Sequence, residues 1–353
     1  MSLRSGSALL LLAMAGLPLA AQDSASPGSQ EPKGPKPVTP LFASPDLLNV
    51  RLTTDFKAIF KDRDTTEQNW VPGTIAWSAG ADSGTMPVEV TTRGHFRLKN
   101  ATCSFPPLRI RFPKEARANT IFDRQGSLKL AVHCRSGNKR YEQIVHQEYL
   151  VYRTFNVLTD SSFKVRMVQA SYVDSAEGKT VEAPAFFIED EDDLAGRIML
   201  KDFEQHGATF SDVDTTAAAL MSVFFYMVGN TDWSLPYLHN VRLFNDVSSY
   251  LPIPYDFDWS GVVDAPYAKP DYRLGIRSVR ERLWRGPCYP SEVIEKTLAR
   301  FVSAKDAIYE LYRSQPGLDP KLLKDSLEYY DEFFKLAADR RTWERELRVT
   351  CTR

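Results

Sequence analysis

The chain has 353 residues, and its 44 Lys and Arg side chains against 45 Asp and Glu give a net charge of −1. A charge sum near zero excludes a protein held to nucleic acid or to an anionic membrane by bulk electrostatics. Hydrophobic residues make up 43% of the chain, which excludes wholesale disorder and predicts a folded core.

Residues 1–21 have the pattern of a secretory signal peptide. Arg4 supplies a positive charge, Ala8 to Leu19 form an apolar stretch, and Leu19-Ala20-Ala21 is the expected cleavage site. The apolar stretch is short for a membrane span, and an uncleaved N-terminal anchor is the alternative. We therefore expect a secreted, periplasmic or cell-envelope protein that keeps no stable membrane span after cleavage.

Residues 22–45 follow as a predicted disordered linker. The stretch Gln22 to Pro40 is rich in Pro, Ser, Gly and Lys and has no apolar period. Such a segment buries too little apolar surface to repay the entropy of ordering. The folded part is expected to begin near Leu47.

The next part of the chain alternates as strands do, and the last part is helical. Three strand-like segments come first, followed by a helix over Tyr141 to Leu158 and two more strand-like segments. Helices dominate after Asp190, and the one over Ala217 to Val228 is apolar on every side, as expected for a buried helix. This order predicts an α+β fold in two lobes, residues 46–190 and residues 191–353, with a ligand cleft between them. The five strand-like segments are VEVTTRGHFRLK, PPLRIRF, SLKLAVHC, SFKVRMVQASYV and APAFFIE, and the later helices cover Pro290 to Arg313 and Lys321 to Glu346.

The four cysteines gain meaning from the predicted export. An even number of cysteines in an oxidising compartment favours pairing, and four allow three connectivities. We expect the local one, Cys103–Cys134 and Cys288–Cys351; free buried thiols are the alternative.

Two acidic segments are candidates for catalysis. Asp232 follows the buried helix in the segment GNTDWS, which continues to Asn240, and a loop held by a rigid element is a common place for a catalytic residue. In PYDFDWSG, alternation puts Asp256 and Asp258 on one face and the aromatic residues on the other. Oxygen ligands of this kind suit Mg²⁺ or Mn²⁺. The alternatives are a turn-forming Asp232 and an aspartate pair that is satisfied by arginines such as Arg277 or Arg282.

A lysine and a glutamate form the third candidate element. Lys129 lies in a predicted strand and Glu148 in the helix that follows it. A strand lysine held by a helical glutamate is how kinase-type enzymes position nucleotide phosphates. Arg109 and Arg111 on the preceding strand compete for this role, and a surface lysine is the alternative for Lys129.

The chain resembles the CotH family of atypical, secreted or spore-coat protein kinases. The matching stretches run in the family's order between Thr91 and Gly286, and they include RGHFR, PPLRIRF, LKLAVHC, FFIEDEDDLAGR, GNTDWSLPYLHN and YDFDWSGVVDAPYA. The resemblance implies a two-lobed, atypical protein-kinase-like fold that binds ATP between its lobes. Two features depart from the pattern: the chain has no glycine-rich phosphate loop, and seven residues separate Asp232 from Asn240 where conventional kinases have four.

The resemblance also implies a role for each candidate residue. Asp232 corresponds to the catalytic-loop aspartate, and Asn240 and Asp256 correspond to metal ligands, with Asp258 as a second acidic contact. Lys129 and Glu148 correspond to the phosphate-positioning pair. The segment Phe187 to Glu191 corresponds to the hinge beside adenine, so Phe187, Ile188 and Glu189 are expected to contact the nucleotide.

We therefore expect an exported kinase that transfers the γ-phosphate of ATP to a protein Ser or Thr with Mg²⁺ or Mn²⁺. A kinase-fold surface or envelope protein without catalysis is the second hypothesis. The third is a hydrolase with two carboxylates, because strand residues two apart lie about 6.6 Å apart, the lower edge of the inverting glycosidase range.

Overall fold

The computed structural model describes residues 34–62, 69–80, 82–245, 249–348 and 351. The predicted signal peptide, residues 1–21, and residues 22–33 of the predicted linker lie outside the described residues. Pro35–Arg353 forms one compact unit. Within the predicted linker, Pro40–Ala43 is a short helix, α1, whose Leu41 and Phe42 side chains are buried.

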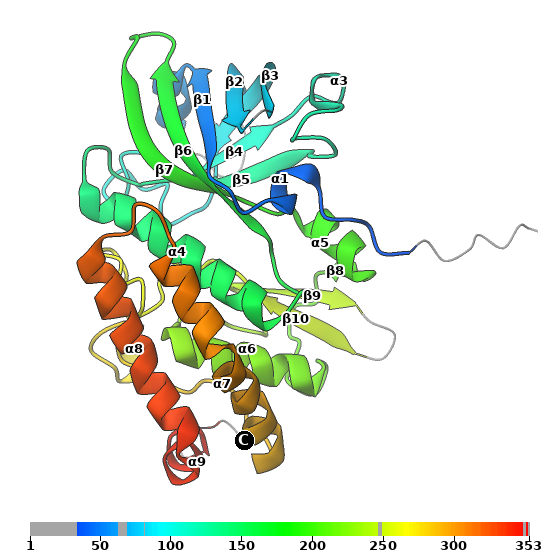
Figure 1. The fold of residues 1–353 in the computed structure, drawn as a ribbon, viewed down its shortest axis with the longest axis vertical. Helices are drawn as coiled ribbons and strands as arrows, with labels where there is room; N and C mark the ends of the chain where they lie inside the picture. The colour runs from blue at the N-terminus through cyan, green and yellow to red at the C-terminus, as the bar shows by residue number, and fades with distance from the viewer. Residues whose placement is uncertain (1–33, 63–68, 81, 246–248, 349–350, 352–353) are drawn as a thin grey trace, which may run out of the picture. The chain divides into compact units, whose positions relative to one another are not determined.

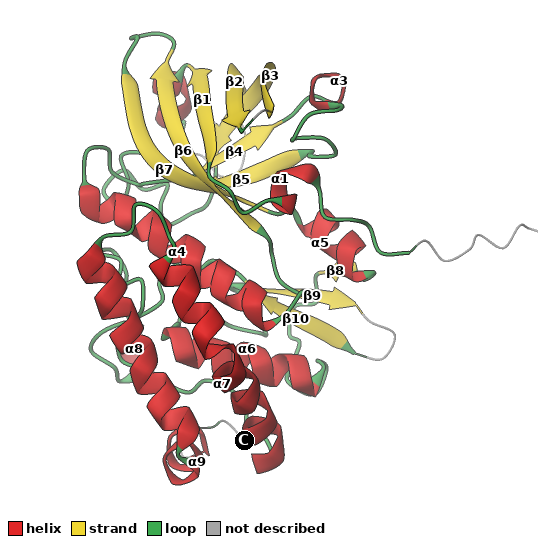
Figure 2. Ribbon diagram, in the orientation of Figure 1, coloured by secondary structure: helices red, strands yellow, loops and turns green. Residues whose placement is uncertain are grey.

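Seven strands form a closed barrel in the part of the unit drawn at the top of Figures 1 and 2. All neighbouring strands are antiparallel except β1 and β6, which are parallel and close the barrel. Around the barrel the order is β1 (Leu48–Thr54), β2 (Val71–Ala79), β3 (Asp82–Thr92), β4 (Leu108–Arg111), β5 (Ser127–Ala131), β7 (Thr180–Ile188) and β6 (Val165–Asp174).

Alternation along β4 and β5 separates the barrel core from the site. Leu108, Ile110, Leu128 and Leu130 are buried in the hydrophobic cluster of the barrel. Successive strand residues point to opposite faces, so the charged residues between them lie on the outer face of the same two strands.

The two-lobed protein-kinase-like fold expected from the sequence is wrong. The described chain has a closed, mixed seven-stranded barrel, an additional three-stranded sheet and helices. The decisive element is β1, which pairs with β2 on one side and with β6, more than 110 residues later, on the other. Alternation indicates which face of a strand is buried, but it does not identify the neighbouring strands, and it missed β1 and β2 altogether.

The α-helices from residue 215 onwards pack below the barrel in the view of Figure 1, with α4 (Lys139–Leu158) between them and the barrel. Helix α4 contacts β6 and β7 as well as α7. The predicted buried helix is confirmed as α6 (Thr215–Val228), in which every side chain from Ala218 onwards is buried. The predicted helix over Lys321 to Glu346 is two helices that meet at Asp339. The remaining helices are α2 (Phe56–Lys61), α3 (Lys114–Arg117), α5 (Glu191–Ile198), η1 (Tyr272–Leu274), α7 (Ser291–Arg313), α8 (Pro320–Ala338) and α9 (Arg340–Arg348).

A small antiparallel sheet lies beside α6, with strand order β10 (Tyr250–Pro254), β9 (Val241–Asn245) and β8 (Lys201–Phe203). It matters for the site because Asn240 immediately precedes β9 and Asp256 lies just beyond β10.

Both expected disulfides, Cys103–Cys134 and Cys288–Cys351, are present. Disulfides are typical of proteins that fold in an oxidising compartment. Among the described residues, no helix combines the length and the apolar content that crossing a bilayer requires.

Candidate functional site

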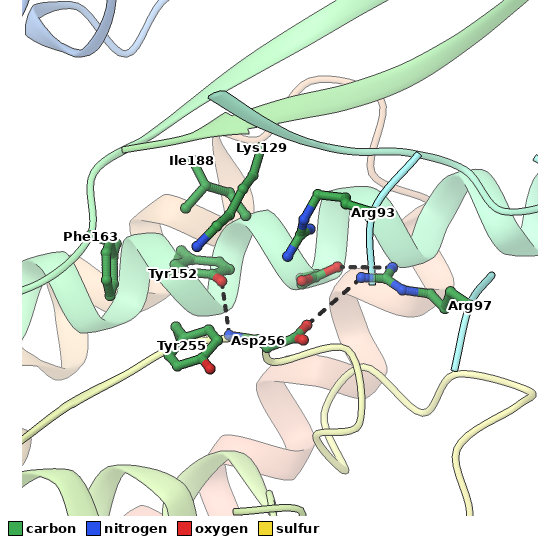
Figure 3. Close-up of a pocket in the computed structure, with 9 residues that line it drawn as sticks. Arg93, Arg97, Lys129, Tyr152, Phe163, Ile188, Tyr255 and Asp256 are labelled. Carbon is green, nitrogen blue, oxygen red and sulfur yellow. Dashed lines mark hydrogen bonds and ion pairs between the residues drawn. The ribbon is translucent and has the colours of Figure 1, made fainter. Parts of the chain in front are cut away.

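A cavity of about 580 Å³ lies between the outer face of β4 and β5 and two loops of the helical part. The barrel side contributes cationic side chains, and the loops contribute carboxylates and an amide. A smaller adjoining pocket, drawn in Figure 3, reaches Glu148 and Tyr152 on α4. The charged and amide residues that line the larger cavity are Arg93, Arg97, Arg109, Lys129, Asp232, Asn240, Asp256 and Asp258.

The cationic side of the cavity follows from strand register. Arg109 on β4 and Lys129 on β5 are Cα partners. Side chains of directly opposed residues share one face of a sheet with Cβ atoms about 5 Å apart. Arg93, which follows β3, donates its backbone N–H to Pro107 O at 2.9 Å, and this bond holds it beside the start of β4. Three cationic side chains therefore converge from β4, β5 and the residue that follows β3.

Lys129 pairs with Glu191 and not with the predicted Glu148. Glu191 is the first residue of α5, and both side chains are less than one-fifth exposed. Burial lowers the pKa of Lys129, and the charge of Glu191 opposes that effect. The predicted pairing was wrong because the chain after β7 turns α5 toward the outer face of β5.

Glu148 is also buried in the site, but its partner is Arg97. Its Oε2 atom lies 3.8 Å from Arg97 Nη1, and its side chain is 3% exposed. Burial raises the pKa of Glu148 well above its ordinary value, against the opposing charge of Arg97.

Arg97 connects three carboxylates that come from two parts of the chain. Besides Glu148, its guanidinium lies 3.7 Å from Asp256 Oδ1 (Figure 3) and 3.4 Å from Asp258 Oδ2. Burial alone would lower the pKa of Arg97, but the surrounding negative groups, Asp258 foremost, raise it well above its ordinary value. Burial raises the pKa of Asp258 to about 6, although Arg97 opposes the rise. Tyr267 Oη also donates to Asp258 Oδ2 at 2.8 Å.

The segment from Asp256 to Asp258 is fixed by the aromatic residue between the carboxylates. Phe257 is fully buried, with its ring centroid 4.6 Å from that of Tyr152. The backbone N–H of Asp256 donates to Tyr152 Oη at 2.8 Å (Figure 3), and Asp256 adopts the left-handed conformation, with φ 59°. A buried ring and a hydrogen-bonded backbone thus direct both carboxylates to the cavity wall.

Asp232 is held by its own loop. Helix α6 ends at Gly229 in the left-handed conformation, and Asn230 Oδ1 then accepts the Asp232 N–H at 2.8 Å. The loop is closed by backbone hydrogen bonds between Ser234 and His239. His239 Nε2 lies 3.1 Å from Asp232 Oδ1, and this hydrogen bond raises the pKa of His239.

Asn240 has an orientation that its neighbours dictate. Its Nδ2 contacts the backbone carbonyl of Asp232 and lies 3.3 Å from Asp232 Oδ2. A carbonyl only accepts hydrogen bonds, so the amide nitrogen must face Asp232 and the amide oxygen is left for a ligand.

The residues predicted to bind a metal fit Mg²⁺ or Mn²⁺ by their donor chemistry. Asn240, Asp256 and Asp258 all line the cavity and offer only oxygen donors. In the described part of the chain, no three His, Cys, Asp or Glu side chains form a metal-binding group. Asn240 would add an amide oxygen to the two carboxylates, a donor that these ions accept.

The predicted nucleotide contacts divide into two groups. Lys129 and Arg109 line the larger cavity, and Ile188 lines the smaller pocket. Phe187 packs in the barrel core, and Glu189 is held by Arg197 at 2.9 Å, so neither is among the lining residues.

Arg111, the third predicted cation, lies outside both of these pockets. It pairs with Glu89 at 3.0 Å and stacks on Trp70, and it lines a separate cavity. Arg111 lies two residues beyond Arg109 on β4, and its Cα partner is Ser127 instead of Lys129.

The sequence motifs gave no individual role to Arg93, Arg97 or His239, and they placed Glu191 only at the end of the predicted hinge. Arg93 and Arg97 stand in RGHFR, a run of cationic residues in a strand-like stretch, which is a signal that could have found them. No local signal identifies Glu191, because its contact with Lys129 is tertiary.

No model of a known protein family matches the chain, and no curated protein matches it significantly. The resemblance to the CotH family therefore stays a prediction that rests on the sequence motifs.

Proposed function

We propose that the cavity binds a nucleoside triphosphate with Mg²⁺ or Mn²⁺ and transfers its terminal phosphoryl group to a Ser or Thr hydroxyl of a protein. The observation that supports this proposal is the division of charge across one cavity. Arg93, Arg109 and Lys129 form one wall, and Asn240, Asp256 and Asp258 contribute oxygen donors to the other.

This arrangement suits phosphoryl transfer because the reaction asks the protein mainly for positioning and charge stabilisation. The cationic wall can hold phosphate oxygens directly. Asn240, Asp256 and Asp258 would hold the metal ion, which when bound supplies further positive charge to the phosphates.

Asp232 is the residue we assign to the acceptor hydroxyl. The hydroxyl oxygen forms a bond to the terminal phosphorus while the bond from that phosphorus to the bridging oxygen breaks, and the nucleoside diphosphate leaves. The hydroxyl proton passes to the Asp232 carboxylate, whose position is fixed by Asn230, His239 and Asn240. His239 is half-exposed, so it can return that proton to solvent.

The site is proposed to work outside the cytoplasm. The signal-peptide pattern of residues 1–21 and the two disulfides support export together. The CotH-like motifs support the proposed phosphoryl transfer, because the stretches GNTDWSLPYLHN and YDFDWSGVVDAPYA supply the loop residues of the cavity.

The test is phosphoryl transfer from ATP with Mg²⁺ or Mn²⁺ to the protein itself or to an added Ser/Thr protein, followed by mass spectrometry for added phosphate. We expect Asp232→Asn to lower the turnover number by about 10²–10⁴-fold, the usual contribution of a positioned general base. Asp256→Asn is expected to abolish metal-dependent turnover. The matched control Asp325→Asn changes an aspartate on α8 that pairs with Lys321 and should leave activity unchanged. Full activity in both site variants would reject the proposal.

A nucleotide-binding protein without transfer is the second candidate. The observation in its favour is that Arg97 already offsets the carboxylates of the site. Calorimetric titration with ATP and Mg²⁺, compared with the transfer assay, separates the two: binding without added phosphate favours this candidate.

A further inference from the structure

Arg97 lies where a cation is needed, at the centre of three carboxylates. Glu148 comes from α4, and Asp256 and Asp258 come from the loop after β10, while Arg97 itself comes from the loop after β3. The Arg97 side chain is only 10% exposed. One guanidinium therefore offsets part of the negative charge of a cluster that two separate elements build.

The contacts of Arg97 are loose in comparison with another buried arginine of the same chain. The three nitrogen–oxygen distances are 3.4 to 3.8 Å, longer than the usual 2.7–2.9 Å of charge-assisted hydrogen bonds. Arg197 instead donates two hydrogen bonds of 2.9 and 3.0 Å to the Glu189 carboxylate and also donates to two backbone carbonyls. Arg97 acts on its carboxylates as a charge, without a fixed hydrogen-bond geometry.

Two of the three carboxylates are the same ones that the proposed metal site requires. A divalent cation at Asp256 and Asp258 would lie close to the guanidinium and repel it. Both cations draw on one pair of carboxylates, so binding of one weakens the binding of the other.

We propose that Arg97 and the divalent cation compete for Asp256 and Asp258, and that Arg97 moves to the phosphates when the metal–nucleotide enters. This inference rests on the proposed metal–nucleotide site. Without a bound metal ion, Arg97 is thus a positioning residue that offsets part of the carboxylate charge. When the metal–nucleotide binds, it becomes a phosphate contact beside Arg93, which lines the same cavity.

The loop that carries Arg97 is built to allow this exchange. Gly94 has φ 89° and open space around it, and His95 is exposed. Leu98, on the other side of Arg97, is buried, and the chain is then tied by the Cys103–Cys134 disulfide. Arg97 therefore lies between Gly94, which has space to change its conformation, and Leu98, which is held in the protein interior.

The first measurement is the affinity for Mn²⁺ without nucleotide, determined from the electron paramagnetic resonance signal of the free ion. We expect Arg97→Gln to bind Mn²⁺ at least about tenfold more tightly than the wild type, because the competing charge is gone. The matched control Arg93→Gln removes a charge from the same cavity, but the ion pairs to Asp256 and Asp258 remain, so its effect should be much smaller. Adding Asp256→Asn to Arg97→Gln should remove the gain.

The second measurement is the affinity for a non-hydrolysable ATP analogue with Mn²⁺. Here the expected effect of the substitution is the opposite. Arg97→Gln should bind the metal–nucleotide more weakly than the wild type, because a phosphate contact is lost. A purely structural role for Arg97 would weaken both kinds of binding together. Equal or weaker Mn²⁺ binding by Arg97→Gln, or a gain that survives Asp256→Asn, would overturn the inference.

Two further comparisons complete the experiment. If Arg97→Gln does not fold, as judged by circular dichroism, the double variant Arg97→Gln with Glu148→Gln removes the buried charge of Glu148 and is measured in its place. If the Mn²⁺ pattern holds but the wild type transfers no phosphate, then phosphoryl transfer is rejected and the competition stands.

Discussion

The side chain of Lys129 on strand β5 forms an ion pair with Glu191, the first residue of helix α5. The pair lies beside Tyr255, whose ring centroid is 5.8 Å from Lys129 Nζ. It joins the barrel to the segment that leads into the small sheet, so it fixes the cationic wall relative to the chain after β7.

We expect the Lys129–Glu191 pair to show energetic coupling. Both side chains are nearly buried, so each single variant, Lys129→Met or Glu191→Gln, leaves a charge without its partner. A double-mutant cycle on the free energy of unfolding in urea should give a coupling of roughly 1–3 kcal/mol. The exposed Lys57–Glu177 pair is the control and should couple much less. Additive effects of Lys129→Met and Glu191→Gln would contradict the assignment.

Tyr152→Phe should loosen the segment that carries Asp256. The variant removes the acceptor of the Asp256 backbone N–H, and an unsatisfied buried donor costs about 1–3 kcal/mol. We expect the free energy of unfolding to fall by that amount and metal binding to weaken with it. Tyr141→Phe, which removes a hydroxyl from a partly exposed tyrosine on the same helix, serves as the control. Unchanged stability in Tyr152→Phe would show that the hydrogen bond is not important.

The two histidines on either side of the start of α4 should make stability depend on pH. Burial lowers the pKa of His133 and of His146 from 6.5 to about 4. Between these values the unfolded chain binds protons that the folded chain does not. Acidification from pH 7 to pH 5 therefore removes stability, by at most about 1.4 kcal/mol per pH unit for each histidine.

The measurement is the urea midpoint of His146→Gln against the wild type at several pH values. Asp258, with a pKa of about 6, acts in the opposite sense, because its folded form binds the proton first. The difference between variant and wild type cancels that contribution. We expect the variant to lose less stability than the wild type on acidification, whereas the exposed His206→Gln should follow the wild type. Parallel curves for His146→Gln and the wild type would refute the prediction.

The two disulfides should stabilise the protein by slightly different amounts. They close loops with sequence separations of 31 and 63 residues. In the chain-entropy account each contributes about 4 kcal/mol, and a doubling of the loop adds about 0.6 kcal/mol. Replacing Cys288 and Cys351 by Ser should therefore lower the free energy of unfolding more than replacing Cys103 and Cys134. The reverse order in guanidinium titrations would contradict this account.

Periodicity in the sequence predicted the elements that surround the site. The segments that became β3 to β7 and α4 carry a clear apolar period, and the segment that became α6 is apolar on every side. Strand β2, with the sequence VPGTIAWSA, was missed because its second and third residues are Pro and Gly, which normally interrupt strands. The wrong fold class followed from these missed strands, because β1 and β2 close the barrel.

The sequence identified most residues of the candidate site but not the contacts between them. Asp232, Asn240, Asp256 and Asp258 were found because each stands in a short motif, and the cavity brings them together. The predicted pairing of Lys129 with Glu148 was wrong, because their actual partners come from α5 and from the loop after β3, whose positions are set by the tertiary structure.

The amino-acid sequence alone was enough to predict the strand and helix periods and the acidic motifs, because these depend on residues that are close together in the chain. The closed barrel, the contact of Lys129 with Glu191 and the position of Arg97 among three carboxylates became visible only in the folded chain. Such contacts join residues 51 or more positions apart, and their energy depends on burial and distance, which no local pattern contains.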